Sequence, residues 1–549
     1  MFLFVFFAKK MKPVFCHSSF KKYFITLIAS MFSMVLLAQI PDNGIDVQHY
    51  RFNILLNDSN NIIKGKAEIT TKFTKTVNEV LFDLVSRNSD GKGMRVTSVK
   101  KNDVPVDFSQ DAQHLIIHDK AVSGVEKIYK VSYEGIPADG LIISNNKFGK
   151  RVFFGDNWPN RAHNWLPCND HLSDKASVDF VVTAPDHYQV ISNGKKIEET
   201  SLADHLKLTH WKEAIEIPTK VMVVGVADFA VNRIDDVDCV PVSSWVFPEE
   251  KDSGFAHYSI AGNILKWFTR HLAPYPFEKL ADVQSKTIFG GMENASCIFY
   301  FENSVDSKTL ESLMAHEIAH QWFGDNATEK DWPHLWLSEG FATYMTDLYF
   351  EDKYGIDTLK SLMRTQRHQV LNFYNKQKTP VVDTSEKNNL MKLLNANSYQ
   401  KGAWVLHMLR RKVGDTLFWK SIREYYQTYK GSNADTRDLR KIFENVTHQN
   451  LKEFFDQWLY TSGQPMLNIS WTYNKSKKIL TLKIEQTQAD AFEFPFQIAL
   501  KENDHTMIKT IGIKNKVTQK NIPLAMRPTE IILDPDVNLL FMGTLKEGL

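Results

Sequence analysis

Residues 316–320 of this chain are His-Glu-Ile-Ala-His, and Glu339 follows after eighteen further residues. On a helix, side chains four residues apart lie on one face, so the imidazoles of His316 and His320 can reach the same ion. Glu339, at the start of the next helical pattern, can supply a third ligand. Two imidazoles and a carboxylate are the ligand set of a catalytic zinc site that leaves one position open for water. The pattern therefore predicts one zinc ion per chain.

Glu317 lies inside the same motif. A side chain one position along a helix projects about 100° away from its neighbour, so Glu317 points beside the ligands and can act as general base on a water molecule. Taken alone, the pentapeptide also fits a solvated helix face, and Glu339 alone also fits a surface carboxylate. Their combination at this spacing favours a metal-dependent hydrolase.

The composition is that of a folded globular protein. The chain has 549 residues, 43% of them hydrophobic and 24% charged, which is too long for one hydrophobic core. Residues 1–38 contain five lysines and no acidic residue, so the remainder has 61 basic against 64 acidic residues, a net charge of −3. This mild acidity argues against binding to nucleic acid or to an anionic membrane surface.

The N-terminus resembles an export signal. Lys21 and Lys22 precede an apolar run over residues 23–37, and Ala38 ends a tolerable cleavage site. The run is shorter than the ~20 residues that a spanning helix needs. We therefore expect a signal peptide over residues 1–38, a periplasmic or secreted protein, and no stable membrane association after cleavage; an N-terminal membrane anchor is the alternative.

Hydrophobic periodicity divides the rest of the chain into three parts. Strand-like alternation over residues 39–235, with Tyr50, Phe52 and Ile54 as one example, predicts an antiparallel β domain. Helical spacing over residues 236–462 predicts a mostly helical domain, in which Ser307 and Ser338 are candidate helix caps. Alternation then returns over residues 463–549, which predicts a small β-sandwich. The expected fold class is multidomain α+β.

Four segments of the chain occur together in one known family. They are Gly-Gly-Met-Glu-Asn at residues 290–294, His-Glu-Ile-Ala-His-Gln-Trp-Phe-Gly from His316, Leu-Trp-Leu-Ser-Glu-Gly-Phe-Ala-Thr-Tyr from Leu335, and Tyr-Gln-Lys-Gly-Ala from Tyr399. In order and separation they resemble the zinc aminopeptidases of peptidase family M1. The resemblance implies a saddle-shaped N-terminal β domain, a thermolysin-like catalytic domain and a C-terminal β-sandwich.

The resemblance also implies roles for these segments. It assigns zinc to His316, His320 and Glu339, base catalysis to Glu317, and stabilisation of the oxyanion to the Tyr399 hydroxyl. It makes residues 290–294 an edge strand beside the substrate, where Glu293 grips a free N-terminus; the residues of this strand are Gly290, Gly291, Met292, Glu293 and Asn294. An α-amino group has a pKa near 7.7–8.0 and is largely cationic at neutral pH, so a carboxylate suits it. The expected substrates are peptides with a free N-terminus.

One position departs from the family pattern. The family has Gln or Glu ten residues before the cysteine that matches Cys168, where it helps to bind the amine, and this chain has Trp158. Asp156 and Asn157 are the candidate substitutes for that second amine anchor.

Two other functions are open from the sequence. A related hydrolase, such as an endopeptidase or an epoxide hydrolase, would use the same metal chemistry. Glu293 argues against an endopeptidase, because its carboxylate has no partner when an internal stretch of chain fills the cleft. An inactive family member that serves as a binding scaffold is the other alternative. The complete set of predicted metal ligands, with Glu317 and Tyr399, argues against it.

Overall fold

The computed structural model describes residues 43–503 and 505–548, and the residues from Gly44 onward form one compact unit. The predicted signal peptide therefore lies outside the described residues. Among the described helices, none combines the length and apolar character needed to cross a bilayer. Cys168, Cys239 and Cys297 are all free.

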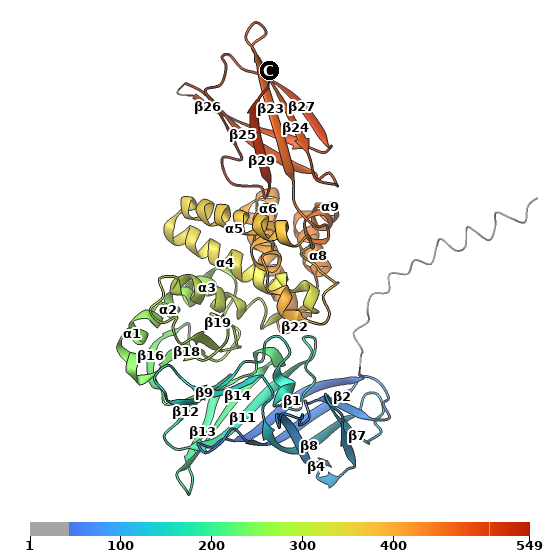
Figure 1. Cartoon of the computed structure of the whole chain (residues 1–549), viewed down its shortest axis with the longest axis vertical. Coiled ribbons are helices and arrows are strands. Elements are labelled where there is room, and N and C mark those ends of the chain that lie inside the picture. The colour runs from blue at the N-terminus through green and yellow to red at the C-terminus, as the bar shows by residue number, and fades with distance from the viewer. Residues whose placement is uncertain (1–42, 504, 549) are drawn as a thin grey trace, which may run out of the picture. The chain divides into compact units, whose positions relative to one another are not determined.

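The N-terminal part is built around an eight-stranded sheet (Figure 1). Its strands, in spatial order, are β13 (Lys195–Ser201), β14 (Leu206–Pro218), β11 (Lys175–Pro185), β1 (Ile45–Leu55), β2 (Ile63–Phe73), β8 (Glu126–Ile136), β4 (Gly93–Lys101) and β5 (Val104–Pro105). Tyr50 and Phe52 of β1 pair with Ile69 and Ala67 of β2, and all four side chains are buried. The alternation predicted for this part therefore marks its core-facing positions.

The prediction of an antiparallel domain is wrong for one pair of strands in this sheet, because β1 and β11 run parallel. The pair joins segments more than a hundred residues apart, so no local pattern indicates its direction. Two small sheets complete this part: β12 (Gln189–Ser192), β15 (Val224–Ala227), β10 (Arg151–Gly155) and β9 (Leu141–Asn145); and β3 (Val80–Asp83), β7 (His114–Ile117) and β6 (Phe108–Gln110). Short helical turns lie at η1 (Ala162–Asn164), η2 (Thr219–Val221) and η3 (Pro248–Glu250).

The middle part contains a five-stranded sheet, which the prediction from helical spacing did not include. Its spatial order is β16 (Ala230–Val237), β17 (Val240–Val246), β18 (Leu280–Ser285), β20 (Cys297–Phe301) and β19 (Gly291–Met292). All six residues of β18 are buried, and β18 runs parallel to both β17 and β20. A strand covered on both faces has no polar alternation, which explains the miss. The predicted boundary after residue 235 falls inside β16.

Helices make up most of the middle part. They are α1 (Lys251–Tyr258), α2 (Ala261–His271), α3 (Leu310–His320), α4 (Trp336–Tyr354), α5 (Ile356–Lys376), α6 (Gly402–Val413), α7 (Asp415–Tyr429), α8 (Thr436–Thr447) and α9 (Lys452–Phe455). Shorter elements are β21 (Ala327–Glu329), η4 (Trp332–His334), η5 (Leu390–Leu393), η6 (Asn397–Lys401), β22 (Ser432–Ala434) and η7 (Asp456–Tyr460).

Both predicted helix caps are wrong. α3 begins three residues after Ser307, whose hydroxyl instead accepts the Thr309 backbone N–H. Ser338 lies inside α4, two residues after its start, and its hydroxyl is hydrogen-bonded to the His320 imidazole.

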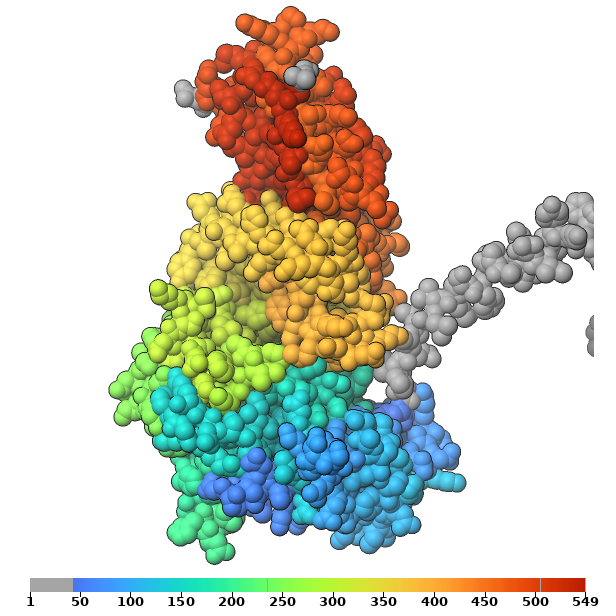
Figure 2. Space-filling view, in the orientation of Figure 1, coloured from blue at the N-terminus to red at the C-terminus, as the bar shows by residue number. Residues whose placement is uncertain are grey.

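The C-terminal part consists of two facing sheets. One is formed by β27 (Val517–Pro523), β24 (Ile479–Gln486), β23 (Met466–Asn474) and β29 (Met542–Glu547), the other by β26 (His505–Ile513), β25 (Phe494–Glu502) and β28 (Glu530–Leu533). In the space-filling view this orange-to-red region is contiguous, as expected for a part built from one stretch of chain (Figure 2). The predicted order of β domain, helical domain and β domain is confirmed.

A buried ion pair connects the first part to the second. The Lys220 ammonium of η2 lies 2.6 Å from the Glu329 carboxylate of β21, and both side chains are almost fully buried. Burial alone would lower the pKa of Lys220, but the carboxylate outweighs it and raises that pKa above its usual value. Lys175 of β11 adds a second link, since its ammonium donates to the Asn326 carbonyl oxygen over 2.7 Å.

Asp347 on α4 is a buried acid whose titration links pH to stability. Its carboxyl accepts two contacts from the Gln366 amide nitrogen, at 3.0 and 2.8 Å, while the Gln366 amide oxygen has no partner among the described residues. Burial raises the pKa of Asp347 to about 8, against an ordinary value of 3.8. A folded-state pKa above the unfolded one means that this group's stabilising contribution is complete below pH 3.8 and is lost as the pH rises toward 8.

We expect Asp347→Asn to be more stable than the native protein at pH 8. The amide stays neutral and can donate to the Gln366 amide oxygen, so the difference in unfolding free energy should grow across pH 4–8 by up to roughly 1.4 kcal/mol per pH unit. Urea unfolding at several pH values measures it, with the exposed Asp357→Asn as control. A difference that is constant with pH would contradict the prediction.

Candidate active site

Three candidate metal ligands meet where α3 and α4 pack together. The Nε2 atoms of His316 and His320 are 3.1 Å apart, and the Glu339 carboxylate is 3.3 Å from each of them. His316 and His320 lie in the last two turns of α3, and Glu339 lies in the first turn of α4. The donor set of two imidazoles and one carboxylate is therefore convergent, as the spacing predicted, and its chemistry suits a borderline divalent metal.

The orientation of His320 is held from its other nitrogen. Its Nδ1 atom is 3.1 Å from the Phe323 carbonyl oxygen and 3.0 Å from the Ser338 hydroxyl, which leaves Nε2 directed to Glu339. Such outer contacts set the tautomer and ring angle of a metal-binding histidine. Gly324 permits this geometry, because its φ is +124° and a Cβ there would lie 2.3 Å from the Ser338 oxygen. Ser338 is thus a positioning residue, not a helix cap.

A second cluster of acids surrounds the same point. Ligand atoms of Glu293, Glu317 and His320 all lie within 4.8 Å of one another, and all three residues are buried. One carboxylate oxygen of Glu293 has no hydrogen-bond partner among the described residues. A buried carboxylate without a partner is costly unless a cation joins it. Binding of a further cation beside Glu293 would therefore be favourable.

The acids and imidazoles shift one another's protonation. Burial raises the pKa of Glu317 well above its usual range. Burial by itself lowers the pKa of His320, but the carboxylates of Glu339 and Glu293 outweigh it and raise that pKa to about 10. Burial lowers the pKa of the other imidazole, His316. In the absence of a metal the carboxylates thus hold a proton on His320, and a metal ion that binds this imidazole would displace that proton.

The Gly-Gly-Met-Glu-Asn segment forms the edge of the middle sheet. β19 pairs only with β20 in the sheet order, and Gly290, Gly291, Met292 and Glu293 line a cavity above the predicted metal ligands. Asn294 is buried and outside that lining, so the structure separates it from the other four predicted substrate-binding residues.

Gln321 holds this segment against α3. Its amide nitrogen donates to the Glu293 carbonyl oxygen over 2.8 Å, and its amide oxygen accepts the Ser296 backbone N–H over 2.7 Å. These bonds fix the backbone on both sides of Asn294. The sequence prediction did not include Gln321, although the residue directly follows His320; a glutamine next to a metal motif carries no chemical pattern of its own.

Tyr399 approaches the cluster from η6, a π-helical turn at the start of α6. Its ring stacks on His316 with centroids 5.9 Å apart, and Tyr399 lines the same cavity as Glu339. Burial raises the pKa of Tyr399 well above its usual value, so the hydroxyl keeps its proton. A close backbone approach places this turn: a Cβ on Gly402 would lie 2.9 Å from the Gly340 Cα atom.

The cavity has a volume of about 240 Å³. Its lining consists of Trp158, Phe289, Gly290, Gly291, Met292, Glu293, Leu313, His316, Glu317, His320, Glu339, Leu394 and Tyr399. It therefore unites nine of the ten predicted metal-binding, catalytic and substrate-binding residues, all except Asn294, with apolar side chains that the sequence did not indicate: Phe289, Leu313 and Leu394.

Neither candidate substitute for the second amine anchor faces this cavity. The buried Asp156 carboxylate is 2.8 Å from the Arg161 guanidinium and also accepts the Ile288 backbone N–H. The Asn157 amide donates to the Met222 carbonyl oxygen and accepts the Trp165 indole N–H. Both side chains are engaged elsewhere, so Glu293 is the one predicted amine anchor that lines the cavity.

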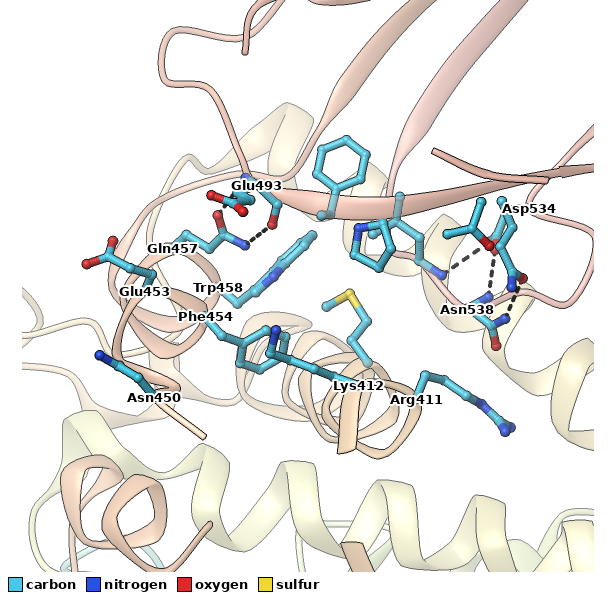
Figure 3. Close-up of a pocket in the computed structure, with 16 residues that line it drawn as sticks. Arg411, Lys412, Asn450, Glu453, Phe454, Gln457, Trp458, Glu493, Asp534 and Asn538 are labelled. Atoms are coloured by element: carbon cyan, nitrogen blue, oxygen red, sulfur yellow. Dashed lines mark hydrogen bonds between the residues drawn. The ribbon is translucent and has the colours of Figure 1, made fainter. Parts of the chain in front are cut away.

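A larger cavity, of about 610 Å³, lies at the junction of α6, η7 and β25 (Figure 3). Several of its polar groups are satisfied by one another; the Gln457 amide nitrogen donates to the Glu493 carbonyl oxygen, and Asn538 donates to Gln497. Neither cluster of candidate metal ligands among the described residues lies in it. Size alone does not make it the chemical centre.

Two family models match the chain. The Peptidase family M1 domain matches residues 257–458, and the Peptidase M1 N-terminal domain matches residues 46–221. The first range contains every predicted site residue, and the second contains Trp158. Together the two matches cover more than half of the chain.

Curated relatives carry aminopeptidase names. A probable aminopeptidase 2 of Sulfurisphaera tokodaii is 27% identical over 78% of this chain and 55% of its own length. The human glutamyl aminopeptidase is 26% identical over 60% of this chain and 36% of its own length. A leucyl aminopeptidase of Saccharolobus solfataricus is 25% identical over 69% of this chain and 50% of its own. The chain spans about half the length of the curated relatives it matches, or less.

Solved structures share the fold. An M1 zinc metallopeptidase from Deinococcus radiodurans superposes with a TM-score of 0.64 at 22% identity, over 76% of this chain and 94% of that one. Aminopeptidase A of Legionella pneumophila, solved with aspartic acid, superposes with a TM-score of 0.81 at 17% identity, over 93% of this chain and 61% of that one. With both family models matched in order along the sequence, the chain belongs to peptidase family M1.

Proposed function

We propose that the protein is a zinc-dependent aminopeptidase that hydrolyses the N-terminal peptide bond of peptides. The observation that carries the proposal is the buried Glu293 carboxylate, which has an unpartnered oxygen and lies in the same cavity as His316, His320 and Glu339. A carboxylate in that setting binds a cation, and the cation that every free peptide offers is its terminal ammonium. The aminopeptidase names of the curated relatives support the same activity.

His316, His320 and Glu339 would hold one zinc ion. Two nitrogen donors and one oxygen donor at 3.1–3.3 Å from one another, with His320 braced from behind by Ser338, suit that ion. When bound, zinc supplies Lewis acidity and favours deprotonation of a water molecule at neutral pH. The zinc metallopeptidase title of the structural neighbour supports this choice of metal.

Glu317 would carry the proton. Its carboxylate is buried next to the predicted metal ligands, and the same burial that raises its pKa makes it a better base than an exposed glutamate. It takes a proton from the attacking water and delivers it to the leaving amine. Because Glu317 would carry out both proton transfers, the reaction requires no other acid in the cavity.

Tyr399 would stabilise the oxyanion. Its hydroxyl is protonated at any working pH and lies in the cavity with Glu317, so it can donate a hydrogen bond to negative charge that develops on the substrate oxygen. Glu293 meanwhile fixes the ammonium group, which limits attack to the first peptide bond. An internal stretch of peptide has no ammonium for Glu293, which disfavours endopeptidase activity.

Export to the periplasm or the medium is part of the proposal. It is supported by the basic and apolar leader over residues 1–38 of the sequence. We propose peptides with a free N-terminus as the substrates, with neither nucleic acid nor a stable membrane association as partner.

We expect the purified protein to contain about one zinc ion and to hydrolyse aminoacyl p-nitroanilides, but not their N-acetylated forms. Acetylation removes the cation that Glu293 binds, so kcat/KM should fall at least 10³-fold, a loss of roughly 4 kcal/mol. Metal analysis and initial rates with and without chelator measure this. Equal rates on free and acetylated substrates would refute the proposal.

For Glu317→Gln we expect the zinc content of the native protein and nearly complete loss of turnover. The amide has the same shape but accepts no proton, so kcat should fall by roughly 10³-fold or more, within the range that loss of a catalytic base produces. The exposed Glu424→Gln on α7 serves as the control. Normal activity in Glu317→Gln would remove this residue as the base.

Gly291→Ala should impair activity far more than Gly290→Ala. A Cβ on Gly291 would lie 2.2 Å from a Glu317 carboxylate oxygen, whereas a Cβ on Gly290 meets its nearest neighbour, Leu313, at 3.8 Å. We expect the first variant to lose roughly tenfold more kcat than the second, because displacing a catalytic group by about 1 Å costs up to ~10²-fold. Similar kcat in both variants would contradict this account.

A further inference from the structure

We propose that the cavity selects peptides whose first residue has an uncharged, apolar side chain, and that Trp158 is a specificity-determining residue. The inference rests on the proposed function, since it concerns which N-terminal residue the aminopeptidase accepts. It follows from three features of the cavity: the chemistry of its lining, its charge balance, and the packing of its wall.

The lining divides into two groups. The ionisable side chains are the proposed metal ligands, the proposed base, the amine anchor and Tyr399, so each already has a task. The remaining side chains are all neutral, and they are apolar except for one indole N–H: Trp158, Phe289, Met292, Leu313 and Leu394. The Trp158 indole N–H has no partner among the described residues. Wherever the first side chain of a peptide lies in this cavity, the surface left for it is therefore almost wholly apolar and carries no charge. Burying apolar area there contributes about 25 cal/mol per Å².

The charges of the loaded cavity balance without any help from the side chain. Glu293, Glu317 and Glu339 supply three carboxylates, and a divalent metal with one ammonium group offsets all three. An added acidic or basic side chain would be buried with no partner of opposite charge. Such a charge costs several kcal/mol, which is enough to exclude the substrate.

Two cations near the wall lie outside the lining of the cavity and are already paired. The Arg161 guanidinium is 5.9 Å from the Phe289 ring, but it is bonded to the Asp156 carboxylate at 2.8 Å. The Lys220 ammonium is 6.0 Å from the Trp332 ring and bonded to Glu329. Neither cation lines the cavity, so an acidic first residue finds no counter-charge.

Trp158 is fixed in its place in the wall. Only 2% of its surface is exposed, and its ring meets Phe289 edge-on at 5.8 Å and Trp332 edge-on at 5.6 Å. Trp332 lies outside the lining, so Trp158 is held between an outer ring and the cavity. A rigid indole here supplies apolar contact area where a polar side chain would offer hydrogen bonds. Its identity should therefore bias the choice of first residue.

The test is a kinetic panel on the zinc-loaded full chain. The substrates are the p-nitroanilides of Leu, Met, Phe, Glu and Lys, with N-acetyl-Leu p-nitroanilide as the control for the proposed function. We expect kcat/KM for Leu, Met or Phe to exceed that for Glu and for Lys by at least roughly 10²-fold. Faster hydrolysis of Glu or Lys would overturn the inference while leaving the aminopeptidase intact. Failure on every free substrate would refute the proposed function instead.

Variants of Trp158 test its role through the ratio of kcat/KM for Leu to that for Glu. Within one preparation this ratio is independent of the fraction of folded enzyme, which separates specificity from stability. Trp158→Gln should lower the ratio at least roughly tenfold, because it replaces apolar wall with an amide. Trp332→Phe, which keeps an aromatic ring behind the wall, should leave the ratio unchanged.

Trp158→Phe provides a second measurement if the glutamine variant fails to fold. The smaller ring keeps the wall apolar and enlarges the cavity, so the preference for Leu over Glu should persist while the ratio of Phe to Leu rises several-fold. Unchanged ratios in the folded Trp158 variants would overturn its assignment as a specificity-determining residue.

Discussion

Three carboxylates and two imidazoles share one buried cluster, and the cost of burying their charge constrains the rest of this protein. Glu293, Glu317 and Glu339 are each about 95% buried, yet Glu293 keeps an oxygen without a partner. Isolated buried carboxylates would neutralise themselves by taking up protons. A divalent metal and a substrate ammonium would remove that penalty, so the proposed ligand set, amine anchor and base would depend on one another.

Close backbone contacts bring these groups together. Glycine stands at the points where a side chain would separate the elements: Gly324 beside His320, Gly291 beside Glu317, and Gly340 against Gly402. The N-terminal β part contributes as well, since Trp158 supplies one wall of the cavity and Lys220 binds Glu329 behind it. The cavity is therefore formed by both parts: the middle part contributes the proposed metal ligands, and the N-terminal part contributes some of the wall.

Local patterns predicted the elements whose environment repeats along the chain. In half-buried strands such as β1 and β2, apolar and polar residues alternate. In the helices of the middle part, apolar residues recur at helical spacing. The buried strands β18 and β20 have no polar alternation and were missed, and the parallel pairing of β1 with β11 joins distant segments. Ser338 looked like a cap because serine favours helix starts, but in the fold its hydroxyl bonds to His320.

The sequence by itself determined the groups that local spacing brings together: the proposed metal-binding motif on one helix and the proposed third ligand on the next. It also indicated the segments that carry Glu293 and Tyr399. Only the tertiary structure decided what lies between them. It turned Asp156 and Asn157 away to other partners, placed Asn294 outside the cavity, and made Trp158 part of the wall. The reason is physical: ligand spacing on a helix is set by covalent geometry, whereas a cavity wall is set by packing among residues far apart in the chain.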